Sequence, residues 1–259
     1  MTSADPIRYP DKPETVYFFG TCLVDNFYAQ AGLAAVELIE REGVRVIFPQ
    51  GQTCCGQPPF NSGYRDEARR VARAQMALFP RPFPVVVPSG SCGAMFRVHY
   101  AELFGGPDTA VSEQAQAREF AARVFEWSEF MHHVLRVRWE DRGPPVRVSY
   151  HPSCHLQREL GVRRAPLALL EQLSGVTLCP VEDAEECCGF GGTFAVKQEP
   201  ISAAMVDDKA RKIVAGGAEV LVACDAGCLM NIGGALARQG PAPRVLPLAQ
   251  FIKERVHEA

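Results

Sequence analysis

The sequence lacks the features of a membrane-spanning, secreted or nucleic-acid-binding protein. No apolar run approaches the roughly 18–20 residues that span a bilayer, so we expect no transmembrane segment. Residues 1–15 contain three prolines but no apolar stretch typical of a signal peptide, and we expect a loose tail there. Asn-x-Ser/Thr acceptor sites are also absent, which favours a cytoplasmic protein. With 27 Lys and Arg residues against 30 Asp and Glu residues, the chain has no basic excess, and we expect no nucleic-acid partner.

Cysteine is the residue type whose use needs an explanation. Ten of the 259 residues are cysteines, which is too sparse for a small scaffold held together by disulfides. Ten thiols are nevertheless more than a hydrophobic core needs. In a reducing compartment, clustered cysteines usually indicate metal binding or redox chemistry.

Most of the cysteines belong to an internal repeat with offsets of 132, 133 and 136 residues. The surrounding sequence repeats as well, since TCCGQPPF (residues 53–60) matches ECCGFGGTF (residues 186–194), and VVVPSGSC (residues 85–92) matches VLVACDAGC (residues 220–228). A double cysteine followed by glycine, at the same place in each half, indicates a duplication. The first set is Cys22, Cys54, Cys55 and Cys92, and the second is Cys154, Cys187, Cys188 and Cys228.

Both halves alternate short apolar stretches with helical patterns, which is typical of parallel βαβ units. We therefore predict an α/β protein of two homologous Rossmann-like halves with mostly parallel sheets, related by a pseudo-twofold duplication. The first cysteine-rich half should span residues 14–110 and the second residues 146–259, with residues 111–145 as a helical connector. The predicted strands are residues 15–19, 44–48, 85–87, 146–150, 176–179 and 220–223.

Each cysteine set should converge at one edge of its sheet. Single cysteines come just after two predicted strands of each half, and the double cysteine lies in the loop after another. Since ligands bind outside the carboxyl ends of parallel strands, the thiols of each half should meet there. Converging thiolates select zinc, copper(I) or iron–sulfur clusters. We expect all eight cysteines of the two sets to be metal and cofactor ligands.

The spacing of the cysteines favours iron–sulfur clusters over zinc. Structural zinc prefers cysteine pairs separated by about two to four residues. Here 31 or 32 residues precede the double cysteine and 36 or 39 follow it. Adjacent cysteines are hard to place on one tetrahedral ion, but they can reach different irons of a larger cluster.

Four residues near the two sets have alternative interpretations. Cys179 lies in a predicted strand without a counterpart in the first half, and we expect it to fill the core. Cys224 is either a core residue or an alternative ligand of the second set. His151 and His155 flank Cys154 and are either ligands, proton donors or hydrogen-bond partners of cluster sulfur, or ordinary loop histidines.

The duplicated motif C-x31-C-C-G-x35-C resembles the CCG cysteine-rich domain of heterodisulfide reductase and of the iron–sulfur proteins of glycolate and glycerol-3-phosphate oxidation. The chain is more similar to the lactate-utilisation protein A family, through FFGTCLVDNFY, FPQGQTCCGQPPFNSGY, VVPSGSCGAMFRVHY and ACDAGCLMNIGGAL, which cover both halves. This resemblance implies a cytoplasmic iron–sulfur protein that oxidises L-lactate to pyruvate together with two other lactate-utilisation proteins, an iron–sulfur subunit and a companion subunit.

The chain departs from the heterodisulfide reductase pattern once in each half. That pattern ends in C-x-x-C and supplies five thiols to a noncubane cluster, but the fifth places here hold Met95 and Asn231. Four cysteines per half are the number that a 4Fe–4S cubane needs. We therefore expect a redox component that relays electrons within a multi-protein system, rather than a stand-alone catalyst. The alternatives are a thiol–disulfide oxidoreductase that uses a double cysteine directly, and a structural zinc scaffold.

Overall fold

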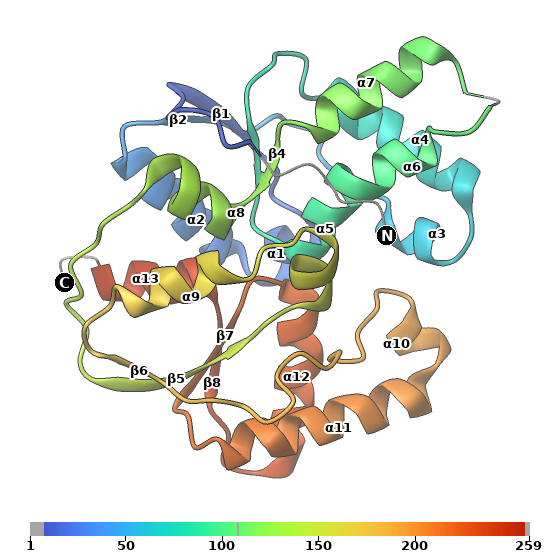
Figure 1. Ribbon diagram of the computed structural model, residues 1–259. Helices are drawn as coiled ribbons and strands as arrows, with labels where there is room; N and C mark the ends of the chain where they lie inside the picture. The colour runs from blue at the N-terminus through green and yellow to red at the C-terminus, as the bar shows by residue number, and fades with distance from the viewer. Residues whose placement is uncertain (1–7, 108, 257–259) are drawn as a thin grey trace.

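The computed structural model describes residues 8–107 and 109–256, and two parallel sheets of four strands form its framework (Figure 1). The first sheet has the order β2-β1-β3-β4, with β1 (Thr15–Phe18), β2 (Arg45–Ile47), β3 (Val85–Val87) and β4 (Val124–Glu126). The second has the order β6-β5-β7-β8, with β5 (Val146–His151), β6 (Val176–Leu178), β7 (Val220–Ala223) and β8 (Arg244–Pro247). The strand order is the same in both halves, and the predicted α/β class with two homologous parallel halves is confirmed.

Helices cover the outer faces of the sheets and fill the space between them. The first half contributes α1 (Cys22–Phe27), α2 (Ala29–Arg41), α3 (Gln57–Asn61), α4 (Arg65–Ala77), α5 (Gly90–Ala94), α6 (Tyr100–Leu103), α7 (Val111–Ala121), α8 (Trp127–Glu129) and the π-helices η1 (Met95–His99) and η2 (Phe130–Leu135). The second half contributes η3 (His155–Glu159), α9 (Arg164–Glu171), α10 (Phe194–Lys197), α11 (Glu199–Ala215), α12 (Ala226–Gln239) and α13 (Leu248–Val256). None of the helices in the described ranges is long and apolar enough to cross a membrane.

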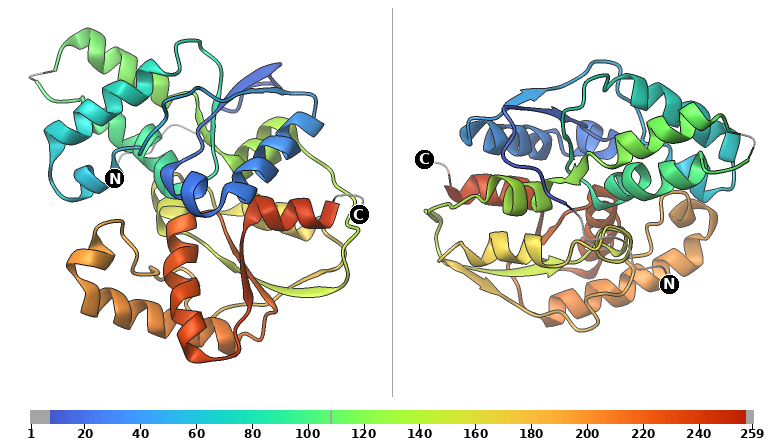
Figure 2. Two further views of the ribbon diagram at one scale, coloured as in Figure 1. Left: turned by 180° about the vertical axis from the view of Figure 1, so that it is seen from behind. Right: turned by 45° about the horizontal axis from the view of Figure 1, so that its top comes forward.

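The two halves stack through a layer of helices, and two further views show the same stacking (Figure 2). Helices α2, α8, α9 and α13 lie between the sheets, and α13 packs against α2. Because strand residues point alternately to the two faces, Val16 and Phe18 face this layer while Tyr17 faces the outer helices. Val148 and Tyr150 of the second sheet belong to the same buried cluster as Val16 and Phe18. The halves therefore share one hydrophobic core.

Polar contacts join the halves where the two cysteine-bearing helices α5 and α12 begin. Ser89 caps α5 and Asp225 caps α12, and the Ser89 hydroxyl donates to Oδ2 of Asp225 at 3.2 Å. The same oxygen accepts the backbone N–H of Ser91 at 2.8 Å. The N–H of Gly90 donates to the carbonyl oxygen of Cys224 at 3.1 Å. The capping residues of the two repeats thus bind each other directly.

The strands of the structure match those predicted to within about two residues, but two strands have no counterpart in the prediction. One of them, β4, lies inside residues 111–145, where a helical connector is predicted. That segment does contain α7, α8 and η2, and it differs from the prediction at β4, which pairs with β3. Three residues are too few for a periodicity to distinguish a strand from a helix. The boundaries at residues 14–110, 111–145 and 146–259 stay a prediction, and the tail predicted over residues 1–15 lies partly outside the described residues.

Candidate metal centres

All the predicted ligand cysteines lie at the carboxyl edges of the two sheets. Cys22 and Cys154 follow β1 and β5, the double cysteines follow β2 and β6, and Cys92 and Cys228 lie in the first turns of α5 and α12. All ten cysteines are free. The parallel topology therefore brings each set of thiols to one place.

In the first half the thiols form a hydrogen-bonded chain in the order Cys22, Cys54, Cys55, Cys92. Hydrogen bonds from the thiols of Cys22 and Cys55 lower the pKa of Cys54 to about 3. The hydrogen bond to Cys54 and burial both raise the pKa of Cys22. Hydrogen bonds to Cys54 and Cys92, together with burial, raise the pKa of Cys55. The negative charge of one thiolate is thus held by protons on its neighbours, and a bound cation can replace those protons.

The second half repeats this chain in the order Cys154, Cys187, Cys188, Cys228. Hydrogen bonds from the thiols of Cys154 and Cys188 lower the pKa of Cys187 to about 2. Hydrogen bonding with Cys188 lowers the pKa of Cys228, but burial together with the negative charges of Asp225 and Cys187 makes the net shift upward. Each half therefore brings four thiols to one edge of its sheet, a soft donor set that fits a thiolate-bound metal or an iron–sulfur cluster.

The glycine after each double cysteine is required by the backbone. Gly56 has a φ of 92° and Gly189 a φ of 81°, in the left-handed region that favours glycine. These turns bring the N–H of Gly56 within 3.5 Å of Sγ of Cys54, and the N–H of Gly189 within 3.4 Å of Sγ of Cys187. A Cβ on Gly189 would also lie 2.8 Å from the carbonyl oxygen of Ser202. The C-C-G motif is therefore a turn that directs a backbone donor at a thiolate.

A cavity of about 240 Å³ opens beside the first site at the junction of the halves. Its apolar walls include Leu23 and Pro58 from the first half, and Phe190 and Val196 from the loop and helix that follow the second double cysteine. The hydroxyls of Ser62 and Thr193, 3.0 Å apart, link the two halves in this region. The same cavity is lined by all four cysteines of the first set: Cys22, Cys54, Cys55 and Cys92.

The residues at the fifth places have other contacts. Met95 is fully buried in the outer core of the first half, and Asn231 donates its amide Nδ2 to the carbonyl oxygen of Cys188 at 2.8 Å. Cys224 is part of the core shared by the two halves. The prediction that Cys179 fills the core is wrong, since the residue follows the end of β6 in a loop and is only half-buried.

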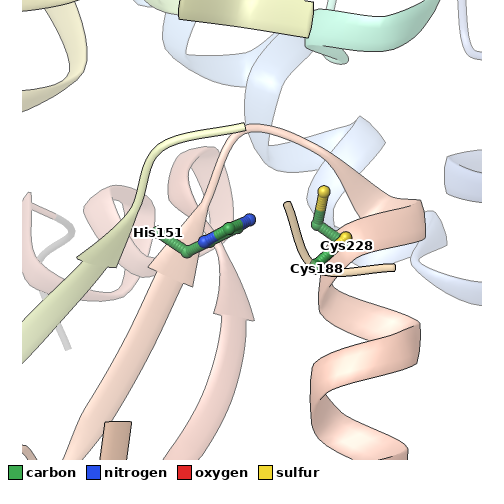
Figure 3. A group of neighbouring side chains, drawn as sticks. All are labelled: His151, Cys188 and Cys228. Atoms are coloured by element: carbon green, nitrogen blue, oxygen red, sulfur yellow. The ribbon is translucent and has the colours of Figure 1, made fainter. Parts of the chain in front are cut away.

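Both histidines that flank Cys154 lie beside the second set. His151 ends β5, and its ring nitrogen and the sulfurs of Cys188 and Cys228 all lie within 4.8 Å of one another (Figure 3). Burial lowers the pKa of His151 to about 3, so its imidazole is neutral. Nδ1 of His155 lies 3.6 Å from Sγ of Cys154.

Two buried polar residues that hold the double-cysteine loops escaped the sequence analysis. Gln75 on α4 donates to Oγ1 of Thr53 at 2.8 Å. Lys209 on α11 donates from Nζ to the carbonyl oxygens of Asp183, at 2.8 Å, and Ala184, at 3.1 Å. Gln75 and Lys209 are 134 residues apart, within the range of the repeat offsets. That offset is the signal by which the sequence could have revealed them.

Comparison with known proteins first defines the class. The family model described as cysteine-rich domain matches residues 16–97 and 148–233, one match in each half. Curated relatives named Lactate utilization protein A match almost the whole chain. The relative from Geobacillus kaustophilus is 46% identical over 93% of this chain and 99% of its own length, and that from Halalkalibacterium halodurans is 45% identical over 94% and 99%. The chain belongs to the lactate utilization protein A family, which confirms the resemblance found in its sequence.

A solved structure shares the fold at much lower sequence similarity. The crystal structure of a hypothetical protein from Helicobacter pylori superposes with a TM-score of 0.70 at 11% identity, covering 100% of this chain and 52% of that one. At this identity the similarity concerns the fold alone.

Proposed function

We propose that this protein is an iron–sulfur electron carrier in the oxidation of L-lactate to pyruvate. Each half would hold one cluster of the 4Fe–4S type through its four cysteines. The observation that carries the proposal is the convergence of four cysteines at the carboxyl edge of each sheet, with the same strand order and the same glycine turn in both halves. Four thiolates match the four irons of a cubane, which take one cysteine each.

The protein would tune such a site with its own groups. The N–H groups of Gly56 and Gly189 donate to the thiolates of Cys54 and Cys187 and so stabilise their negative charge. Cys55 and Cys188 are buried, which removes water from part of each site. A bound cluster would supply one-electron chemistry, and these contacts would set its reduction potential.

The assignment to lactate rests on the relatives, which are named Lactate utilization protein A. Oxidation of L-lactate to pyruvate releases two electrons and two protons, so it requires an electron acceptor. The sequence offers no flavin motif and no arginine clamp for a carboxylate substrate. We therefore propose that partner proteins, an iron–sulfur and a companion subunit, perform or share the lactate chemistry, and that this chain relays the electrons.

Metal analysis of anaerobically reconstituted protein tests the proposal. We expect iron and acid-labile sulfide in nearly equal amounts and an electron paramagnetic resonance signal after reduction. Cys54→Ser and Cys187→Ser should each halve the iron, because each removes one site. The matched control Cys179→Ser should leave the iron unchanged, because Cys179 belongs to neither set.

Two other results would overturn the proposal. Stoichiometric zinc without sulfide would indicate a structural zinc scaffold. Disulfide-exchange activity in metal-free protein that depends on Cys54 or Cys187 would indicate a thiol–disulfide enzyme. The lactate role is tested separately in the native host. Deletion of the gene should abolish growth on L-lactate, and Cys179→Ser but not Cys54→Ser should restore it.

A further inference from the structure

The two cysteine sites differ in the side chain that follows or ends the first strand. Phe19 lies three residues before Cys22, and His151 lies three residues before Cys154. Phe19 directly follows β1 and donates its N–H to Val86 of the neighbouring strand, whereas His151 ends β5 and pairs with the equivalent strand β7. The two residues therefore occupy the same position of the repeat.

At the first site this position holds an aromatic side chain that packs against other aromatic rings. Phe19 is fully buried, and its ring centroid lies 4.6 Å from that of Phe96 and 6.4 Å from that of Phe79. Phe19 has no polar atom in its side chain, so the position supplies no hydrogen-bond donor to the first cysteine set.

At the second site the same position holds a buried donor. His151 is 3% exposed, and its Nε2 has no hydrogen-bond partner among the described residues. Figure 3 shows the ring directed from the end of β5 toward Cys188 and Cys228. A buried polar atom without a partner is rare in folded proteins, and Nε2 of His151 is therefore free to form a hydrogen bond at the second site. Asn231, at the fifth place of the second motif, donates its amide to the carbonyl oxygen of Cys188.

The residues that hold the double-cysteine loops differ in charge. Gln75 anchors the first loop with a neutral amide, whereas Lys209, a residue that is 1% exposed, anchors the second with its amine. Lys209 lies close to the second site, because its Nζ donates to the carbonyl oxygens of Asp183 and Ala184 in the loop that leads to Cys187. The second site thus has a buried cation and a buried N–H donor, where the first has Gln75 and Phe19. It also has the carboxylate of Asp225 where the first has Ser89, but three hydrogen-bond donors already stabilise that negative charge.

We propose that His151 and Lys209 hold the reduction potential of the second site above that of the first, so that electrons collect in the second half. This inference rests on the proposed function. Reduction adds negative charge to a site, and both a hydrogen bond from Nε2–H to sulfur and a nearby cation stabilise that charge. One electron leaves the first site, which is oxidised, and enters the second, which is reduced, with no bond made or broken. Four thiols already satisfy a cubane, so His151 acts on the potential without ligating.

Redox titration of the reconstituted full-length protein, followed by electron paramagnetic resonance, tests the inference. We expect two midpoint potentials in the wild type, and only the higher one in Cys54→Ser. Lys209→Gln and His151→Phe install the side chains of the first half, and each should lower the higher potential and leave the lower one unchanged. The reciprocal variant Gln75→Lys should raise the lower potential. Lys253→Gln, which removes a positive charge on α13 outside both sites, should shift neither.

Iron and sulfide contents separate the two ways in which this experiment can fail. Protein without sulfide refutes the proposed function together with this inference. Full clusters with one shared midpoint potential, or a higher potential that Lys209→Gln and His151→Phe leave unchanged, refute only the inference. His151→Gln controls for packing, since it keeps an N–H donor and should retain part of the higher potential. A nitrogen coupling as strong as that of a bound ligand, absent in His151→Phe, would overturn the hydrogen-bond role.

Discussion

Replacing Asp225 with alanine should strongly weaken the junction between the two halves. Asp225 is 4% exposed, and its carboxylate accepts three hydrogen bonds. They come from the N–H of Ser91 at 2.8 Å, the N–H of Gly227 at 3.1 Å and the hydroxyl of Ser89 at 3.2 Å. Ser89 and Ser91 belong to the first half and Gly227 to the second, so one side chain both caps α12 and joins the halves.

The magnitude follows from the donors that alanine would leave unpaired. A buried donor that loses its partner costs about 1–3 kcal/mol. Asp225→Ala leaves two backbone N–H groups without an acceptor, those of Ser91 and Gly227. The hydroxyl of Ser89 still has Oγ of Ser91 at 3.2 Å and adds less. We expect the free energy of unfolding to fall by about 3–5 kcal/mol. Asp225→Ser, which installs the cap residue of the first half, should cost about half as much, since a serine hydroxyl still caps the helix.

Equilibrium unfolding in urea measures this loss. Wild type and variants are prepared and loaded in parallel without oxygen, and the transition is followed by tryptophan fluorescence and circular dichroism. The exposed Asp207 provides a matched control, and Asp207→Ala should change the free energy of unfolding by less than about 0.5 kcal/mol. A loss below about 1 kcal/mol for Asp225→Ala would refute the reasoning. It would mean that water accepts hydrogen bonds from the two unpaired N–H groups as well as the carboxylate does.

Three further predictions concern buried charge, close packing and pH. Asp141→Ala should cost about 3–5 kcal/mol in urea unfolding, because the buried Arg255 would lose the carboxylate 2.7 Å away. Gly90→Ala should cost about 1–3 kcal/mol in the same assay, since its new Cβ would lie 2.8 Å from a leucine Cβ of the second half. A hydrogen bond with Glu159 raises the pKa of His99, so the stability that it adds is complete below the unfolded-state pKa of about 6.5 and is lost as the pH rises through the folded pKa. The difference in free energy of unfolding between wild type and His99→Gln should therefore shrink as the pH rises above about 6.5.

Each of these predictions has its own control. Adding Arg255→Met to Asp141→Ala should recover part of the loss, because no buried charge is then unpaired. Gly106→Ala should be nearly neutral, since a Cβ there meets nothing within 4 Å. Wild-type stability in Gly90→Ala would contradict the close approach of the halves. A difference between wild type and His99→Gln that grows with pH would contradict the assigned ion pair.

Much of the fold was predictable because its signals are local. Buried runs such as residues 85–87 and 220–223 are apolar and rich in β-branched valine, and the structure has strands at these same residues. The strand β4 was missed, because its three residues become a strand only by pairing with β3. Cys179 was wrongly expected in the core. It follows an apolar stretch in the sequence, but strand β6 ends one residue earlier and Cys179 lies in a loop, only half-buried.

The sequence by itself determined the duplication, the parallel α/β class and the two sets of four cysteines, because repeat offsets and strand periodicity are properties of the chain. Only the tertiary structure decided how the two sites differ. His151 faces Cys188 and Cys228, and Lys209 reaches the second site from α11, through contacts between segments distant in sequence. The packing of α13 on α2 likewise joined the halves through one core. Such contacts depend on which side chains meet after folding, and the spacing of residues along the chain does not give the distance between them in the folded protein.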